Sequence, residues 1–372
     1  MIFIKKLFLI TIIFLLLFNQ TYAVDLTEFT SEIKKYSNEY FPELSDDNLL
    51  TAMSSASNSL NTETFIKRIL GSITKEFRNN ISLIFKVIGI AILCSILKNI
   101  QSNLGESGIS EIAFYVCYIL IVVLIMTSFT SIINVCKSTI VNLSDFMKVL
   151  IPVVISLMLV TGNIATVAVV EPILLSMISI ITALLSNFVI PAIFISTIIN
   201  IISNMSEHVN VKKIGETLRK CSLWCMEIAL IIFVGVLSLE GTLSANVDGI
   251  TAKTAKAVVS SAVPVVGKLL GDTVDSVIGG MTITKNALGT VGVIVVVAIT
   301  ILPLIKTLIL MFTFNVASAL VEPIADGRIV KCMSGIGDSI KILFAIMATI
   351  TFLFIIAITL IIKVTNFSIM YR

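Results

Sequence analysis

The chain has 372 residues, of which 57% are hydrophobic and 13% are charged, and its formal net charge is +3. About a quarter of the residues in a typical soluble domain are charged, so this composition excludes a soluble fold and predicts a multi-spanning membrane protein. The basic residues are scattered along the chain, which argues against nucleic acid as a partner.

Residues 1–23 have the pattern of a secretory signal peptide. Two lysines precede an apolar run that ends at Phe18, and a Thr-x-Ala sequence ends at Ala23. We expect cleavage after Ala23, with an uncleaved signal anchor as the alternative. In either case the segment that follows, residues 24–80, is exported.

The exported segment 24–80 is the only long polar stretch of the sequence, and its second half has helical periodicity. A cap is expected at Thr62. The apolar positions that follow recur at helical spacing: Phe65, Ile66, Ile69, Leu70, Ile73 and Phe77. We expect this helix to lie on the membrane surface or to dock on a partner protein, although a passive spacer would have a similar sequence.

Residues 81–372 are expected to form an all-α membrane domain with about six to eight transmembrane helices. Crossing a hydrocarbon core of about 30 Å takes about 20 helical residues. The clear candidates are residues 81–97, 112–135, 149–170, 222–243 and 340–363. Two longer runs, 172–203 and 287–321, contain prolines and are each either one long span or a broken pair. The loop charges do not decide the orientation.

The segment 246–287 is too polar to predict a plain span and too apolar for a loop. Small residues, including Gly267 and Gly271, lie beside a stripe of valines and allow helices to approach closely. We expect two short helices joined at Pro264 that lie at the membrane interface or re-enter it. The stripe is either an amphipathic connector or a surface that lines a pore or contacts another subunit.

The tetrapeptide Val-Glu-Pro-Ile occurs twice, and the match extends beyond it. Residues 150–173 align without a gap on residues 301–324. Four of the chain's seven prolines are thereby paired: Pro152 with Pro303 and Pro172 with Pro323. Because proline and glutamate are scarce in this chain, we predict an internal duplication. The repeat halves are about 81–203 and 222–363.

Each repeat copy is expected to be a helix bounded by proline, because proline suits the first turn of a helix. Glu171 and Glu322 would then precede a new helix, where the helix dipole favours negative charge. They are either structural joints or members of a charged ring at an opening. The repeats are inverted if residues 172–203 cross the membrane once and parallel if they cross twice.

Several charged residues fall within or near the predicted spans. Glu227 and Lys306 are candidates for an intramembrane pair, because a charge at that depth needs a partner or a water-filled cavity. For Lys86 and Glu240 we expect the side chains to reach the membrane surface.

The sequence contains no pattern that predicts catalysis. A single histidine, His208, excludes two-histidine metal motifs, and no nucleophile motif occurs. All six cysteines lie in or beside apolar runs and are expected to be buried. We therefore expect no enzyme activity, no catalytic residues, no bound metal and no cofactor, so transport would draw on an ion gradient or on a separate ATPase.

Four stretches of the second half resemble a known family. They are "TAKAVVSSAVPVVGKLLGDTVDSVIGG", "KNALGTVGVIVV", "ILPLIK" and "ALVEPIADGRIVKCMSGIGDSIKILFA". They are similar to the stage III sporulation protein AE family of endospore-forming bacteria. The resemblance is specific over residues 246–350 and covers nearly the whole mature chain. The family motifs fall on Ala319 to Val330 and on Gly335 to Ser339, and the resemblance assigns neither a role.

The resemblance implies a mother-cell protein in the outer forespore membrane. It would act as the membrane-embedded subunit of a channel that links mother cell and forespore and that late forespore development requires. The partners implied are a cytoplasmic ATPase, ring-forming proteins of the intermembrane space, a forespore-side protein and further copies in an oligomer. The alternatives are a stand-alone secondary transporter built on the repeat and a membrane scaffold that conducts nothing.

Overall fold

The computed structural model describes Ser31 and residues 62–104, 107–160, 164–205, 211–262 and 266–370. The expected signal peptide and most of the exported segment lie outside these residues. The helices are α4 (Thr62–Leu104), α5 (Ser107–Val160), α6 (Ile164–Leu184), the π-helical turn η2 (Leu185–Val189), α7 (Ile190–Met205), α8 (Lys212–Ala262), α9 (Val266–Val321) and α10 (Gly327–Met370). The described part of the chain is therefore all-α, as the sequence predicts.

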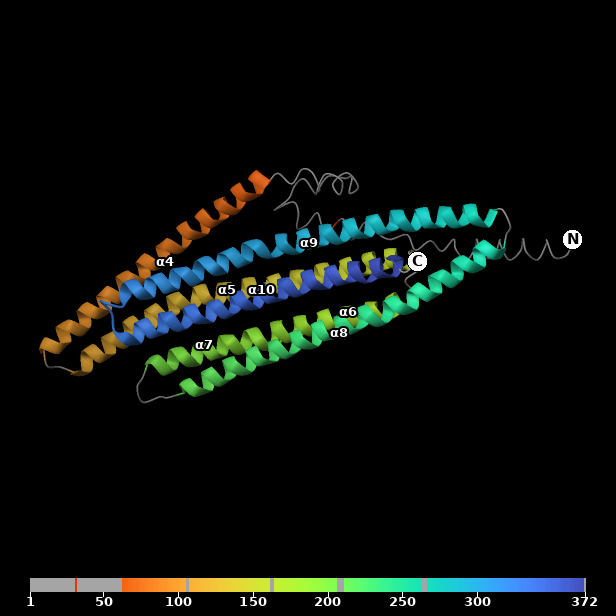
Figure 1. The fold of residues 1–372 in the computed structure, drawn as a ribbon. Coiled ribbons are helices and arrows are strands. Elements are labelled where there is room, and N and C mark those ends of the chain that lie inside the picture. Colours follow the sequence, from red (N-terminus) through yellow and green to blue (C-terminus); the bar gives the residue numbers. More distant parts are fainter. Residues whose placement is uncertain are drawn as a thin grey trace.

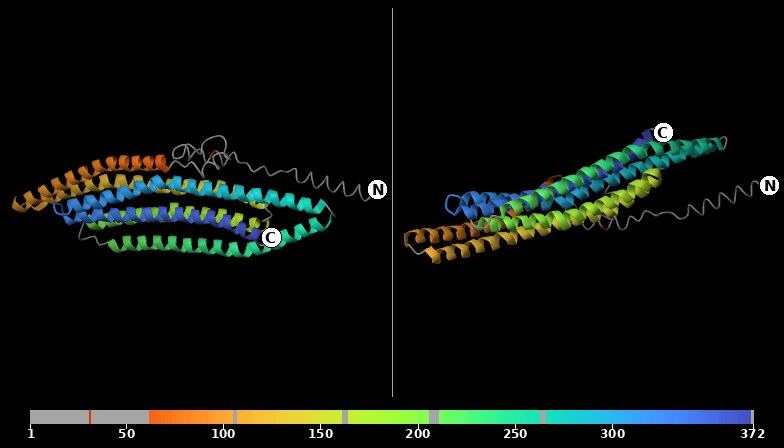
Figure 2. Two further views of the ribbon diagram at one scale, coloured as in Figure 1. Left: turned by 45° about the horizontal axis from the view of Figure 1, so that its top comes forward. Right: turned by 90° about the horizontal axis from the view of Figure 1, so that it is seen from below.

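The helices lie side by side in an elongated bundle and run alternately in opposite directions (Figure 1, Figure 2). At one end α4, α7 and α9 finish and α5, α8 and α10 begin; we call it the α4–α5 end. At the other end α5 and α8 finish and α6 and α9 begin; we call it the α8–α9 end. Each helix thus crosses the bundle once.

Helix α10 is the centre of the bundle, and α4 and α8 are its edges. The last helix packs against α9, α8, α5 and α7. Helix α4 packs against α9 and α5, whereas α8 packs against α7, α10, α6 and part of α9. The two edge helices lie on opposite sides of the bundle (Figure 1).

Within the residues that the structure describes, six helical runs are apolar and long enough to cross a membrane, which makes the chain an integral membrane protein. They are Ile73–Ile96, Phe114–Leu159, Val167–Met205, Lys212–Leu237, Gly279–Val321 and Gly327–Ile362. The run in α5 has 46 residues, or about 69 Å at 1.5 Å per residue. It is more than twice as long as a hydrocarbon core of about 30 Å requires.

The separate spans 112–135 and 149–170 expected from the sequence are wrong. Helix α5 continues from Ser107 to Val160 without interruption. Its charged residues suggested a loop, but Asp145 and Lys148 lie exposed on the helix and form an ion pair of 3.3 Å. Since a helix surface accommodates such a pair, the charges do not end the helix.

Residues 164–205 form one continuous helical run rather than a broken pair, with the turn η2 near its middle. Proline at position 191 cannot donate a hydrogen bond to the preceding turn, and its ring would contact the carbonyl there. The backbone widens into a π-helical turn just before it, where the Ile190 N–H bonds to the Leu185 oxygen. The run 287–321 is likewise continuous, within α9.

The segment 246–287 does not form two short helices. Its first part is the end of the 51-residue helix α8, and its second part begins the 56-residue helix α9. The expected joint at Pro264 coincides with residues 263–265, which lie between these helices and outside the described residues. The stretch therefore extends the bundle at its α8–α9 end (Figure 1).

Helix α4 begins at Thr62, where the sequence predicts a helix start, and runs on to Leu104. No helix boundary separates residues 80 and 81, so the amphipathic helix and the first candidate span are one element.

Glycines allow α9 to approach its neighbours closely at the α8–α9 end. A Cβ atom at Gly292 would lie 2.7 Å from the Leu150 side chain of α5. One at Gly289 would overlap the Ile362 side chain of α10. At these two glycines the backbone of α9 therefore lies directly against side chains of α5 and α10.

The two matched segments of the predicted repeat differ in structure. Residues 150–173 pass from α5 into α6, whereas residues 301–321 are continuous helix. The expected helix with proline at each end is therefore wrong, because Pro152, Pro172 and Pro303 lie inside helices and Pro323 lies in a turn. The matched parts of α5 and α9 run in opposite directions (Figure 1). The duplication itself stays a prediction.

Candidate functional site

Helix α10 exposes a row of polar side chains in the part nearest the α4–α5 end. Lys331, Ser334, Asp338 and Lys341 are exposed at alternating steps of three and four residues, so they lie on one face of the helix. We call this row the polar stripe. Four helices cover the other sides of α10. The stripe lies within a candidate membrane span, where exposed charges need a water-filled space or a partner.

Helix α5 carries no charge at the same depth along the bundle. The Arg328 guanidinium lies 5.6 Å from the centre of the Phe114 ring, and the Cys136 sulfur lies 4.0 Å from the Leu343 oxygen. The polar stripe therefore lies level with the part of α5 between these two contacts. That part contains no charged residue. Its exposed side chains are first apolar, namely Val116, Ile119, Leu120 and Val123, and then polar but uncharged, namely Thr127, Thr130, Ser131 and Asn134.

Behind the polar stripe, the Ser339 hydroxyl joins three helices. It accepts hydrogen bonds of 2.8 Å from Thr197 Oγ1 of α7 and from Arg219 Nη2 of α8. It donates one of 2.9 Å to the Gly335 oxygen one turn earlier in α10. Because Ser339 and Thr197 are buried, these bonds fix the relative positions of α7, α8 and α10.

Arg219 connects this buried cluster to the surface charges. Its guanidinium is half-buried and interacts electrostatically with Asp338 of the stripe and Glu216 of α8. Glu216 in turn lies 3.8 Å from Lys212. The Arg219 Nε atom is buried and has no hydrogen-bond partner. A continuous set of charges therefore spans the gap between α8 and α10.

Two close approaches support this region. Ser196 of α7 donates a 2.7 Å hydrogen bond to the Gly215 oxygen of α8, and a Cβ atom at Gly215 would lie 2.8 Å from Asn200 Oδ1. On the other side, a Cβ atom at Gly337 would lie 2.8 Å from Asn315 Oδ1 of α9. Glycine at these positions lets α8 approach α7 closely and lets α9 approach α10 closely.

The motif around the second Val-Glu-Pro-Ile forms the turn between α9 and α10. The N–H of Ala325 bonds to the Val321 oxygen at 2.8 Å, and Asp326 Oδ1 accepts a 2.8 Å bond from the N–H of Arg328. Asp326 is thus the N-cap of α10. This motif starts the helix that carries the polar stripe.

The structure does not bring Glu171 and Glu322 together. Glu171 is half-buried near the start of α6, at the α8–α9 end, whereas Glu322 is exposed in the turn at the α4–α5 end. The two carboxylates therefore cannot form a single ring. Neither directly precedes a helix as expected, since Glu171 lies inside α6 and Glu322 precedes the turn that begins α10.

The proposed pair of Glu227 and Lys306 is also wrong. Lys306 of α9 lies 3.9 Å from Glu76 of α4. Glu227 is exposed on α8. Of the other residues singled out from the sequence, Gly267 and Gly271 lie in the first turns of α9, and their surroundings lie outside the described residues.

The cysteines are not all buried. Cys94, Cys136 and Cys332 are buried and Cys117 and Cys225 are half-buried, but Cys221 is exposed on α8. An apolar helix surface that faces lipid or another protein places a cysteine outside the core just as it does an isoleucine.

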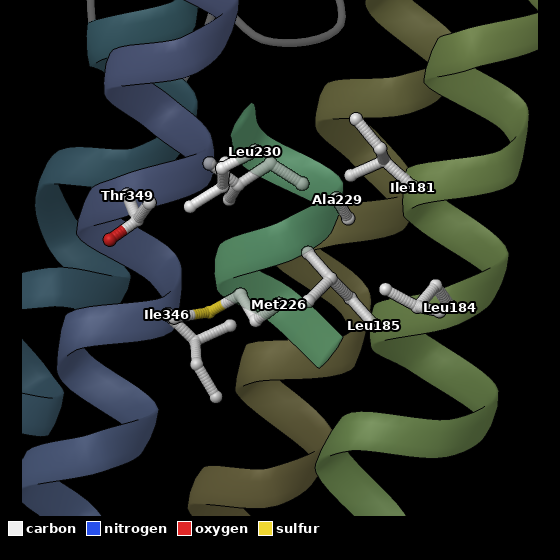
Figure 3. Close-up of a pocket in the computed structure, with 9 residues that line it drawn as sticks. Ile181, Leu184, Leu185, Met226, Ala229, Leu230, Ile346 and Thr349 are labelled. Atoms are coloured by element: carbon white, nitrogen blue, oxygen red, sulfur yellow. The ribbon is translucent and has the colours of Figure 1, made fainter. Parts of the chain in front are cut away.

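A small pocket lies between the π-helical turn, α8 and α10 (Figure 3). Its lining side chains include Leu185, Met226, Leu230 and Ile346, with Thr349 contributing a hydroxyl. Its space is about that of one water molecule. The pocket is therefore a packing gap beside η2 and too small to be a conduit.

The sequence interpretation missed the residues that meet at Ser339. In the sequence Arg219 is one of four neighbouring basic residues, with Lys212, Lys213 and Lys220, and all four lie inside α8. The available signal was the family motif at Gly335 to Ser339, whose glycine and serine residues are small enough for helix contacts.

Comparisons with known proteins agree with the resemblance noted in the sequence. The family model described as stage III sporulation protein AE matches residues 44–365. Stage III sporulation protein AE of Bacillus subtilis (strain 168) is 29% identical over 345 residues, which cover 93% of this chain and 86% of that protein. No solved structure matches.

Proposed function

The chain belongs to the stage III sporulation protein AE family, and we propose that it is the membrane-embedded subunit of a transenvelope channel that links mother cell and forespore during endospore formation. In this role it resides in the outer forespore membrane and is required for late forespore development. It has no catalytic task of its own.

One observation carries this proposal: at the same depth the bundle has a charged face and a face without charges, part of which is apolar. The polar stripe of α10 lies opposite exposed apolar residues of α5 such as Val116 and Val123. A chain surrounded by lipid on all sides would expose apolar residues on both faces, because charges in hydrocarbon are costly. A subunit that borders a water-filled passage on one side needs this division.

An orientation follows from the premise that residues 24–80 are exported. Helix α4 then starts on the exported side and ends on the cytoplasmic side, so the α4–α5 end is cytoplasmic. Basic residues do not add to this argument, because Lys212 and Lys213 lie at that end and Lys253, Lys256 and Lys268 lie at the other. A separate cytoplasmic ATPase would meet the α4–α5 end, and ring proteins of the intermembrane space would meet the opposite end.

Accessibility to water distinguishes the channel subunit from a scaffold that conducts nothing. In a cysteine-free chain, Ser334→Cys and Asp338→Cys should react with a charged, water-soluble maleimide in sporulating cells. Ile119→Cys and Val123→Cys, at the same depth on α5, should react at least tenfold more slowly. Equal reaction at all four positions would show that this depth lies outside the membrane, and the proposal would be withdrawn.

A stand-alone secondary transporter is the second candidate, because α5 and α9 carry the matched segments in opposite directions, as in inverted repeats. This candidate predicts ion-coupled uptake by the purified protein in liposomes. The channel subunit predicts no uptake alone and a loss of spore formation when Ser334 is replaced by Phe, with the variant still accumulating in the membrane.

A further inference from the structure

From Trp224 to Gly235 the outward face of α8 is apolar except for one carboxylate, and Lys220 continues the same row toward the start of the helix. Trp224 and Ile231 are 71% and 72% exposed. Gly235 has open space around the position of its missing side chain. Glu227 is exposed between them. These residues follow one another at steps of three or four, so they form one row, which we call the α8 face.

Glu227 lies well inside the candidate span Lys212–Leu237. No ion pair involves it among the residues that the structure describes. A carboxylate within an apolar row is costly against lipid and is stabilised by a positive charge on a protein partner. The α8 face therefore favours a partner helix that is apolar with a matching cation.

Helix α4, at the opposite edge of the bundle, has an outward face that carries cations: Lys75 and Arg78 are exposed in one row, together with Ser82. Arg78 is exposed on the side of α4 that points away from α5 and α9, in line with Phe85, which is 68% exposed. Gly71 and Gly89 lie in the same row, and nothing lies near the positions of their missing side chains. We call this row the α4 face. Its two glycines allow a helix to approach closely.

Contacts across the bundle set the depth of the two faces. Met226 of α8 and Ile346 of α10 line the same pocket (Figure 3). Gly337 lies against Asn315 and Gly289 lies against Ile362, and interpolation between these contacts places Ile346 level with Lys306.

Lys306 is paired with Glu76 of α4, so Met226 and Glu76 lie at one depth. Because α4 and α8 run in opposite directions (Figure 1), Gly71 is level with Ile231. By the same count Lys75 is level with Glu227, and Arg78 lies about one helical turn from Glu227, within reach of two long side chains.

We propose that copies of this chain associate edge to edge in the membrane, the α8 face of one copy against the α4 face of the next, with Glu227 paired with Arg78 and Ile231 beside Gly71. We choose a second copy of the chain as the partner of the α8 face because its α4 face carries a positive charge at the depth of Glu227. The two faces differ, so the contact is heterologous and repeated contacts close a ring or extend as a row.

This association would place the polar stripe and α5 on different sides of the assembly. The α4 and α8 edges lie above and below α10 in Figure 1, with α10 in front and α5 behind. In a ring, one of these sides faces the centre and the other faces lipid. The association does not require the channel function, but the two together put the charged side inward.

The test is disulfide cross-linking in native membranes. A cysteine-free chain that carries Gly71→Cys and Ile231→Cys should form a ladder of dimers, trimers and higher species on oxidation. The matched control carries Gly89→Cys with Ile231→Cys, where the positions differ in depth by about 27 Å. We expect at least tenfold less cross-linking in the control. Absence of the ladder, or equal ladders in both, would overturn the proposal.

Single-cysteine chains test the heterologous geometry. Chains with Ile231→Cys and chains with Gly71→Cys, carrying different tags and expressed together, should form mixed dimers and no larger species. Strong dimers from Ile231→Cys alone would show a symmetric contact between two α8 faces and would refute the proposal.

A charge exchange tests the ion pair in the chain with Gly71→Cys and Ile231→Cys. Glu227→Arg and Arg78→Glu should each reduce the ladder at least fivefold while the chain still accumulates in the membrane, and the combined variant should restore it. Lack of restoration would contradict the pairing of Glu227 with Arg78. A ladder combined with no maleimide reaction at Ser334→Cys would leave the association in place and refute the channel function.

Discussion

Two stretches that lie side by side in the bundle, the α5 segment around Val123 and the polar stripe of α10, are exposed at the same depth and differ completely in chemistry. The α5 segment exposes apolar side chains from Val116 to Val123 and uncharged polar ones after Thr127, whereas the stripe carries two lysines, an aspartate and a serine. Both belong to helices that are long and apolar enough to span a membrane. The difference teaches that the polarity of the exposed surface changes around the circumference of the bundle. The mean hydropathy of a helix therefore does not predict whether its exposed side faces lipid, water or protein.

The largest effect is expected where the stripe meets the core. Ser339→Leu adds volume at a buried position and leaves Arg219 and Thr197 without their shared acceptor. Overpacking and unpaired polar groups each cost about 1–3 kcal/mol, so the variant should hardly accumulate in the membrane. Ser334→Leu, one turn away on the exposed side, should accumulate normally. Immunoblots of membrane fractions compare the two, and equal amounts would contradict the assigned role of Ser339.

The contrast between the two faces is tested directly by placing the same charge on each. Val123→Lys puts a lysine on the apolar face, with an expected penalty of about 3 kcal/mol near the middle of a span. Ser334→Lys adds a lysine to a face that already carries two and should cost less than about 1 kcal/mol. The temperature at which each variant aggregates in native membranes, without detergent, measures the two destabilisations. Equal destabilisation would remove the distinction between the faces.

A smaller effect is expected from the packing that holds α9 against α10. Gly289→Ala places a methyl group 2.6 Å from Ile362 Cγ1, so the isoleucine must move, at a cost of about 1–3 kcal/mol. The matched change Gly279→Ala meets open space and should be neutral or slightly stabilising, because alanine favours helix. Melting of the purified variants in detergent separates them, and a lower melting temperature for Gly279→Ala would refute the packing argument.

The smallest effect is expected from the two glutamates of the repeated tetrapeptide. Glu171→Gln with Glu322→Gln should change stability by less than about 0.5 kcal/mol, since neither side chain is fully buried and surface charges contribute little. Spore formation should stay at the wild-type level, whereas Asp338→Leu within the stripe should reduce it at least tenfold. Normal spore formation by the Asp338 variant would shift the functional surface away from α10.

The sequence alone predicted the helical membrane fold and the start of α4 at Thr62, because both depend on local composition and periodicity. It did not predict that α5 continues through Asp145 and Lys148, since a charged stretch between apolar runs has the same composition in a loop and on a helix surface. Local sequence patterns could not predict the hydrogen-bonded cluster at Ser339. Its partners Thr197 and Arg219 are 142 and 120 residues away in sequence, and only the packing of three helices places them together.

The unbroken α5 has a consequence for the reach of the molecule. Its apolar run of 46 residues is about 69 Å long, so about 39 Å remains when it crosses a hydrocarbon core of about 30 Å upright. The other helices run alongside it over most of that distance (Figure 2). If the bundle stands upright, one part of it projects beyond the hydrocarbon core, where a neighbouring protein would bind it without touching the lipid.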